Sequence, residues 1–186
     1  MKVRIGELTM ECVRGDIAAQ PDMDAIVNAA NAALLPGGGV AGAIHRAAGP
    51  GLEQECRPLA PIRPGQAVIT GAHRLPNRHV IHCLGPVFGV DIPSDELLAA
   101  CYRSALRLAE RRGLGSVAFP SISTGIFGYP MAEAAAVAFN TLLAERAALK
   151  AVRHIRFVLF GETDLQLHQQ ALRQAAEQTG ERYDVE

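Results

Sequence analysis

The sequence lacks the closely spaced cysteines that are typical of zinc sites and redox-active dithiols. The four cysteines are irregularly spaced and form no C-x-x-C pair, which argues against a zinc site or a redox dithiol. We expect free, buried thiols in a reducing cytoplasm. His79 and His82 are three residues apart in a predicted strand, so their side chains point to opposite faces and cannot chelate one metal ion. We expect no metal site, and we expect His82 to be a core histidine with satisfied hydrogen bonds.

The sequence also lacks an excess of charge and a long hydrophobic run. Its 18 Lys and Arg against 19 Asp and Glu give a net charge of −1, so no basic field attracts nucleic acid or acidic membranes. Charged residues interrupt the first 16 positions, which excludes a signal peptide, and no run is long enough to span a bilayer. A chain of 186 residues with 49% hydrophobic composition predicts one globular domain over residues 1–186, with a frayed tail at about 179–186.

Short apolar runs and helical patterns alternate along the chain. Strands are predicted at residues 3–5, 10–13, 25–27, 67–69, 80–83, 117–119 and 155–160. Helices are predicted from Val40, from a cap at Ser94, and from a capping box of Thr163 and Gln166 to about Gln178. This alternation predicts an α/β fold, a three-layer α/β/α sandwich with a mixed, mostly parallel sheet to which the initial strands add an antiparallel edge.

Residues 26–49, IVNAANAALLPGGGVAGAIHRAAG, pass from a strand through three glycines into a helix. The glycines allow the backbone to approach a ligand closely, and the amides at a helix N-terminus favour anions such as phosphate. The alternative is that the glycines only let a tight loop pack while Asn28 and Asn31 cap backbone groups. No Gly-Lys-Ser/Thr follows, so this is not a nucleotide-triphosphate P-loop.

A second stretch, ISTGIFGYP at residues 122–130, places small residues directly after the predicted strand at 117–119. Neighbouring parallel strands end at the same edge of a sheet, so the two loops are expected to face each other there. Two facing sets of backbone amides suit a diphosphate.

VNAAN followed by GGGVAGAIHRAAG resembles the macro domain family, ADP-ribose-binding modules of which some are hydrolases. GDI at 15–17, VIHCLGP at 80–86, ISTGIFGYP at 122–130 and VLF at 158–160 follow in the family's order, so the resemblance covers residues 13–172. It implies the α/β/α sandwich predicted above.

The resemblance also implies a set of ligand contacts. The carboxylate of Asp16 and the amide of Ile17 would read adenine, and the ring of Phe160 would stack on it. The diphosphate would lie between two groups of residues, and the distal ribose beside Asn31 and Phe127. These two groups are Gly38, Gly39 and Val40, and Ser123, Thr124, Gly125, Ile126 and Phe127. Asn31, Gly39 and Phe127 would be nearest the chemistry. On the residues alone, Asp16 is a bend residue and core packing is the alternative for both phenylalanines, although the position of Phe127 in a loop between Gly125 and Gly128 favours its exposure.

Ala41 departs from the hydrolytic branch, in which an Asp proposed to activate water often follows GGGV. The resemblance therefore implies substrate-assisted hydrolysis of ester-linked mono-ADP-ribose, on acidic side chains or as O-acetyl-ADP-ribose, with no cofactor. A phosphate oxygen of the substrate would hold the attacking water against the anomeric carbon. The alternatives are a non-catalytic reader of ADP-ribose and a phosphatase-like role on RNA or nucleotides.

Overall fold

The computed structural model describes residues 1–186 and contains an eight-stranded sheet in the order β4-β5-β3-β6-β7-β2-β1-β8. The five strands from β5 to β2 are mutually parallel, whereas β4, β1 and β8 run antiparallel to their neighbours. The strands are β1 (Lys2–Ile5), β2 (Leu8–Arg14), β3 (Ala25–Ala29), β4 (Ala67–Gly71), β5 (His79–Cys83), β6 (Ser116–Phe119), β7 (His154–Leu159) and β8 (Tyr183–Val185).

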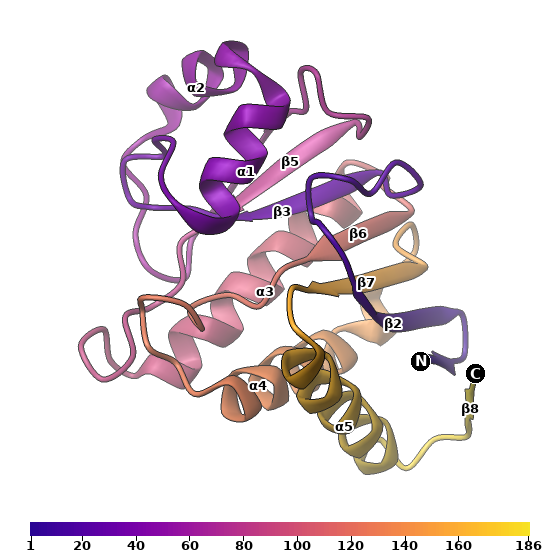
Figure 1. The fold of residues 1–186 in the computed structure, drawn as a ribbon. Coiled ribbons are helices and arrows are strands. Elements are labelled where there is room, and N and C mark those ends of the chain that lie inside the picture. Colours follow the sequence, from indigo (N-terminus) through magenta and orange to yellow (C-terminus); the bar gives the residue numbers. More distant parts are fainter.

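Helices cover both faces of this sheet (Figure 1). Helices α1 (Gly39–Ala48) and α2 (Pro50–Cys56) pack on one face, and α3 (Ser94–Arg111), α4 (Met131–Ala144) and α5 (Glu162–Gln178) pack on the other. Because strand side chains alternate, Val27 of β3 belongs to the core under α3 to α5 and Ile26 to the core under α1 and α2. The predicted three-layer sandwich is confirmed.

The N-terminal ends of two helices differ from the prediction. Pro93, not Ser94, is the N-cap of α3, and the Ser94 hydroxyl instead donates to the carbonyl of Asp91 at 2.6 Å. Gly161 is the N-cap of α5, so Thr163 lies inside the helix and the predicted capping box with Gln166 does not form. In both cases the chain enters the helix one or two residues earlier than the polar side chain suggested.

The C-terminal tail is not frayed, which corrects the prediction for residues 179–186. Residues Tyr183–Val185 form β8, which pairs antiparallel with β1. The amide of Lys2 donates to the carbonyl of Glu186 at 2.8 Å, and the amide of Glu186 donates to the carbonyl of Lys2 at 2.9 Å. The tail is ordered because it covers the hydrogen-bonding edge of β1. The initial strands are therefore antiparallel to each other, as expected, but β8 forms the edge of the sheet.

The cysteines are free and buried, as expected: Cys12, Cys56, Cys83 and Cys101. Burial raises the pKa of Cys12 and Cys101 to about 12, so these thiols stay protonated and are poor nucleophiles. None of the helices combines the length and the apolar character that crossing a membrane requires.

Candidate functional site

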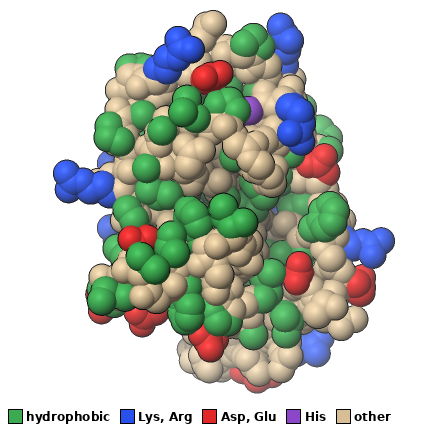
Figure 2. Space-filling view, turned by 60° about the vertical axis from the view of Figure 1, so that its left-hand side comes forward, with side chains coloured by type: hydrophobic (Ala, Val, Ile, Leu, Met, Phe, Trp, Pro, Cys, Tyr) green, Lys and Arg blue, Asp and Glu red, His purple; other side chains and the backbone are tan.

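Three loops that follow β3, β6 and β7 gather at the carboxyl ends of these strands, on the left in Figure 1. They enclose a cleft of about 660 Å³ together with the loop after β2. Seen from this side, hydrophobic side chains and backbone occupy the centre of the face, and most Lys and Arg side chains lie at its margin (Figure 2). The cleft is lined by Gly15, Asp16, Ile17, Gly39, Val40, Ala43, Arg46, Pro120, Ser121, Thr124, Gly125, Met131, Val158, Leu159, Phe160 and Asp164.

The glycine loop presents the start of α1 to the cleft. The amides of Gly39, Val40 and Ala41 open the helix and donate to no acceptor within the protein, whereas the amide of Gly42 already bonds to the carbonyl of Gly38. A Cβ at Gly42 would lie 2.3 Å from the carbonyl oxygen of Gly37, so glycine is required where the loop folds back on the helix. The positive end of the helix dipole and three free amides favour an anion here.

The loop after β6 presents a second run of free amides. Thr124, Gly125, Ile126 and Phe127 donate no backbone hydrogen bond within the protein. The loop is shaped instead by bonds at its base, from the amide of Tyr129 to the carbonyl of Ser123 at 2.9 Å and from the amide of Gly128 to the carbonyl of Gly125 at 3.0 Å. Thr124 and Gly125 line the same cleft as Gly39 and Val40. The two predicted sets of backbone amides therefore contribute to one cleft.

A buried glycine holds this second loop in place. Gly85 follows β5, and a Cβ there would lie 2.1 Å from the hydroxyl oxygen of Ser123 and 2.5 Å from Cγ2 of Ile122. Ser123 has a φ of 65°, and its hydroxyl is buried without a hydrogen-bond partner. The close approach of residues 122–123 thus depends on the absence of a side chain at position 85.

The end of the cleft formed by β2 and β7 brings Asp16, Ile17 and Phe160 together. Oδ1 of Asp16 accepts a hydrogen bond from the amide of Ala18 at 2.9 Å, while Oδ2 and the amide of Ile17 have no partner in the protein. The side chain of Phe160 is 95% exposed, so it does not pack in the core. An exposed ring beside a free carboxylate oxygen and a free amide suits a flat, polar base.

Other predicted site residues do not line the cleft. Asn31 bonds to the main chain of Leu35 through both ends of its amide, with Nδ2 donating at 2.8 Å and Oδ1 accepting at 3.0 Å. Phe127 is half-buried against the core under α1, so the exposure that its loop position favoured is not observed, whereas Ile126 is fully exposed. Gly38 is the N-cap of α1, and a Cβ there would meet no atom within 4 Å.

Asn28 follows the predicted strand at 25–27, but β3 extends to Ala29, so Asn28 lies within the strand and is 1% exposed. Its Nδ2 lies 3.1 Å from Nδ1 of His82, whose Nε2 lies 2.9 Å from the Thr70 hydroxyl. Burial lowers the pKa of His82 to about 4, so the ring is neutral at physiological pH. The prediction of a satisfied core histidine is confirmed.

Nine other lining residues were not assigned to the site from the sequence: Gly15, Ala43, Arg46, Pro120, Ser121, Met131, Val158, Leu159 and Asp164. Arg46 lies seven residues after Gly39 in α1, and Ala43 lies four after it, so both share the helix face that begins at the glycine loop. This spacing could have identified them. Met131 and Asp164 are in the first turns of α4 and α5, where nothing in the local sequence distinguishes them from ordinary helical residues.

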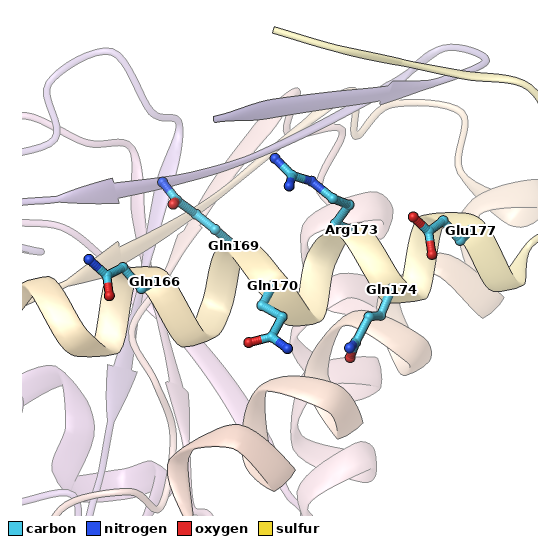
Figure 3. Close-up of a pocket in the computed structure, with 6 residues that line it drawn as sticks. All are labelled: Gln166, Gln169, Gln170, Arg173, Gln174 and Glu177. Carbon is cyan, nitrogen blue, oxygen red and sulfur yellow. The ribbon is translucent and has the colours of Figure 1, made fainter.

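A second hollow lies on the outer side of α5 (Figure 3) and does not suit a specific ligand. No hydrophobic residue lines it, and its side chains extend in different directions from one exposed helix. The residues are Gln166, Gln169, Gln170, Arg173, Gln174 and Glu177. Nor does the structure bring together a group of three His, Cys, Asp or Glu side chains that could hold a metal ion.

Comparison with known proteins agrees with this geometry. The family model described as Macro domain matches residues 27–138. A macro domain-containing protein of Chlorobaculum tepidum is 48% identical over 164 residues, covering 88% of this chain and 95% of the relative. A protein of Cronobacter sakazakii named O-acetyl-ADP-ribose deacetylase is 46% identical over 173 residues, covering 90% and 96%.

The solved structures include the Oceanobacillus iheyensis macrodomain with ADP, which is 42% identical to this chain. The two structures superpose with a TM-score of 0.91 over 96% of this chain and 97% of the other. The chain belongs to the macro domain family.

Proposed function

We propose that this protein binds ADP-ribose in the cleft and hydrolyses ester-linked mono-ADP-ribose. The proposal rests on two groups of backbone amides that donate no hydrogen bond within the protein and contribute to one cleft. They belong to Gly39–Ala41 and to residues 124–127. A diphosphate is the group that fits between two such runs, because each of its phosphates can accept several amide hydrogen bonds. Adenine would then lie on the exposed ring of Phe160, with its amine at Asp16.

The distal ribose would extend past Gly125 towards Phe127 and Asn31. Although Asn31 already bonds to Leu35, one amide hydrogen and one lone pair of its side chain stay available. It can therefore orient a ribose hydroxyl or a water without giving up the bonds that hold its loop.

For an ester whose oxygen is attached to the anomeric carbon, the proposed reaction is attack by water on that carbon. An oxygen of the nearer phosphate holds the water, the bond from that carbon to the ester oxygen breaks, and the carboxylate leaves with the bonding electrons. The water gives up a proton and its oxygen becomes the anomeric hydroxyl. A carboxylate needs no protonation to leave, so an ester tolerates the lack of a catalytic acid.

Ala41 cannot act as a base, and its side chain is buried at 6% exposure. A positioned general base typically contributes about 10²- to 10⁴-fold, whereas correct placement of the reactants reaches effective molarities of about 10⁵ to 10⁸ M. Placement can therefore sustain hydrolysis without the base. The name of the Cronobacter sakazakii relative supports an activity of this type.

The second candidate is a reader that binds ADP-ribose without cleaving it, and Ala41 favours this alternative. Phosphatase-like action on a nucleotide or RNA is supported only by the phosphate-binding loops. The substrates that the ester hydrolase implies are ADP-ribosylated proteins and O-acetyl-ADP-ribose, and the buried free thiols fit a reducing compartment such as the cytoplasm.

Product analysis separates the three candidates. The protein is incubated with a glutamate-linked mono-ADP-ribosylated protein and with O-acetyl-ADP-ribose, and ADP-ribose binding is measured in parallel by calorimetry. Release of free ADP-ribose supports the proposal, binding without release leaves the reader, and release of inorganic phosphate indicates a phosphatase. In the Asn31→Ala variant we expect hydrolysis to fall more than ADP-ribose affinity, because the contribution of Asn31 grows towards the transition state.

A further inference from the structure

The carboxylate of Asp164 lies in the cleft and has no partner within the protein. It lies in the first turn of α5 and lines the cleft together with Asp16 and Phe160. Its carboxylate takes part in no hydrogen bond or ion pair, and only its main-chain carbonyl is used, by Nδ1 of His168 at 2.8 Å. Oδ2 of Asp164 lies 3.6 Å from the position of a Cβ on Gly161, so the carboxylate lies alongside the segment that carries Phe160.

We infer that Asp164 selects ligands whose adenosine ribose carries free hydroxyl groups and rejects those with a phosphate on that ribose. The inference rests on the proposed function, in which adenine lies on Phe160 and its ribose follows towards the diphosphate. A carboxylate accepts a hydrogen bond from a ribose hydroxyl, and it repels a phosphate at the same position. Acidic residues in dinucleotide-binding folds discriminate the two forms of that ribose by the same chemistry.

The neighbouring charges strengthen this discrimination. Asp16 adds a second carboxylate to this end of the cleft. Arg14, the basic residue nearby, is paired with Glu162 at 3.6 Å. Arg46 is a cation of the cleft lining, and its Nη1 lies beside the glycine loop, 3.0 Å from the Cβ position of Gly42. Arg46 is thus the only Lys or Arg in the cleft lining, and Arg14 is already paired.

A purely structural role for Asp164 makes a different prediction. An Asp in the first turn of a helix is stabilised by the helix dipole, so its loss lowers stability whatever ligand is present. Glu162 occupies the same turn and carries the same charge, but it is exposed, paired with Arg14 and outside the cleft lining. Because Glu162 also pairs with Arg14, the matched control is the double variant Arg14→Gln/Glu162→Gln, which removes a carboxylate from the first turn of α5 without leaving Arg14 unpaired near the cleft.

The test compares the affinities of ADP-ribose and 2′-phospho-ADP-ribose by calorimetry. One pair of like charges about 6 Å apart in a water-like dielectric changes affinity roughly threefold, so a phosphate with about two charges gives roughly tenfold weaker binding. We expect this gap in the wild type and in Arg14→Gln/Glu162→Gln, and a gap of about threefold or less in Asp164→Asn. Raising the salt concentration screens exposed charges, so it should narrow the gap in affinity more in the wild type than in Asp164→Asn, in which only Asp16 still repels the phosphate.

The outcomes separate this inference from the proposed function. Equal affinities of the wild type for the two ligands, or an unchanged gap in a folded Asp164→Asn protein, would overturn the role of Asp164 while leaving ADP-ribose binding intact. Absence of ADP-ribose binding by the wild type would overturn the proposed function itself. If Asp164→Asn does not fold, Asp164→Ser retains a residue suited to a helix start and is subject to the same two criteria.

Discussion

Adding one methyl group at Gly85 tests how the second amide loop is positioned. In Gly85→Ala, the new Cβ would lie 2.1 Å from the hydroxyl oxygen of Ser123 and 2.5 Å from Cγ2 of Ile122. Ordinary contacts of this kind are about 3.5 Å or longer, so residues 122–123 have to move by more than about 1 Å. The movement carries the free amides of Thr124 and Gly125 away from the position that a diphosphate would occupy.

Overpacking of this kind costs about 1 to 3 kcal/mol. For a domain of this size, each kcal/mol lowers Tm by about 2 to 4 °C, so we expect a Tm lower by about 2 to 12 °C. ADP-ribose affinity should fall by at least about fivefold, which corresponds to about 1 kcal/mol, because the displaced amides no longer converge on the phosphates.

Differential scanning fluorimetry gives Tm and calorimetry gives the affinity. The double variant Gly85→Ala/Ser123→Gly removes the hydroxyl oxygen and the Cβ of Ser123, and it also relieves the positive φ of that residue, so it should recover part of both losses. An unchanged Tm together with an unchanged affinity in Gly85→Ala would refute this account of the loop. Equal losses in the single and double variants would show that Ser123 is not the point of contact.

Three further predictions concern other parts of the structure. Gly38→Glu should fold normally, because Gly38 has extended backbone and open space around it. It should weaken ADP-ribose binding by about tenfold or more, because its carboxylate repels the two phosphate charges, so an unchanged affinity in calorimetry would remove the loop from the site. Asp16→Ala should weaken ADP-ribose by about 1.5 to 3 kcal/mol, and if the contact to the adenine amine is real, inosine-containing analogues should bind the wild type more weakly than adenine ones. The free energy of unfolding should decrease as the pH falls from 6.5 to about 4. In this range His82 is protonated in the unfolded chain, where its pKa is 6.5, but stays neutral in the folded protein, where its pKa is about 4. The contribution of His82 is at most about 3 kcal/mol, and denaturation of His82→Gln as a function of pH should show a shallower slope in this window, whereas an identical slope would contradict the assignment.

The arrangement of strands and helices could be predicted because the apolar runs of β3, β5, β6 and β7 are buried on both faces and alternate with helical patterns. Strand β8 could not be predicted, because Tyr183–Val185 is short and polar and is ordered by residues of β1 at the other end of the chain. The predictions of helix caps at Ser94 and Thr163 were wrong for a related reason. A polar side chain near a helix start suggests a cap, but the path of the preceding loop decides which residue takes that position.

The two glycine-rich loops of the site were predicted from local sequence, because glycines and a following helix determine where free amides lie. Gly85 and Asp164 were not, since their importance depends on which segments the fold places beside them. Asn31 lies between these cases. Its position after β3 is as expected, but its bonds to Leu35 are a feature of the loop that spacing alone does not reveal.

The most direct test of the proposed reaction is the fate of the oxygen from water. A peptide with mono-ADP-ribose on a glutamate is hydrolysed in H₂¹⁸O, and the released peptide is weighed by mass spectrometry. Attack at the anomeric carbon breaks the bond between that carbon and the ester oxygen, so the glutamate keeps both of its original oxygens. The released peptide should then have the same mass as the unmodified, unlabelled peptide. Entry of one ¹⁸O into the glutamate carboxylate, or no release of the peptide from ADP-ribose, would contradict substrate-assisted attack at the anomeric carbon.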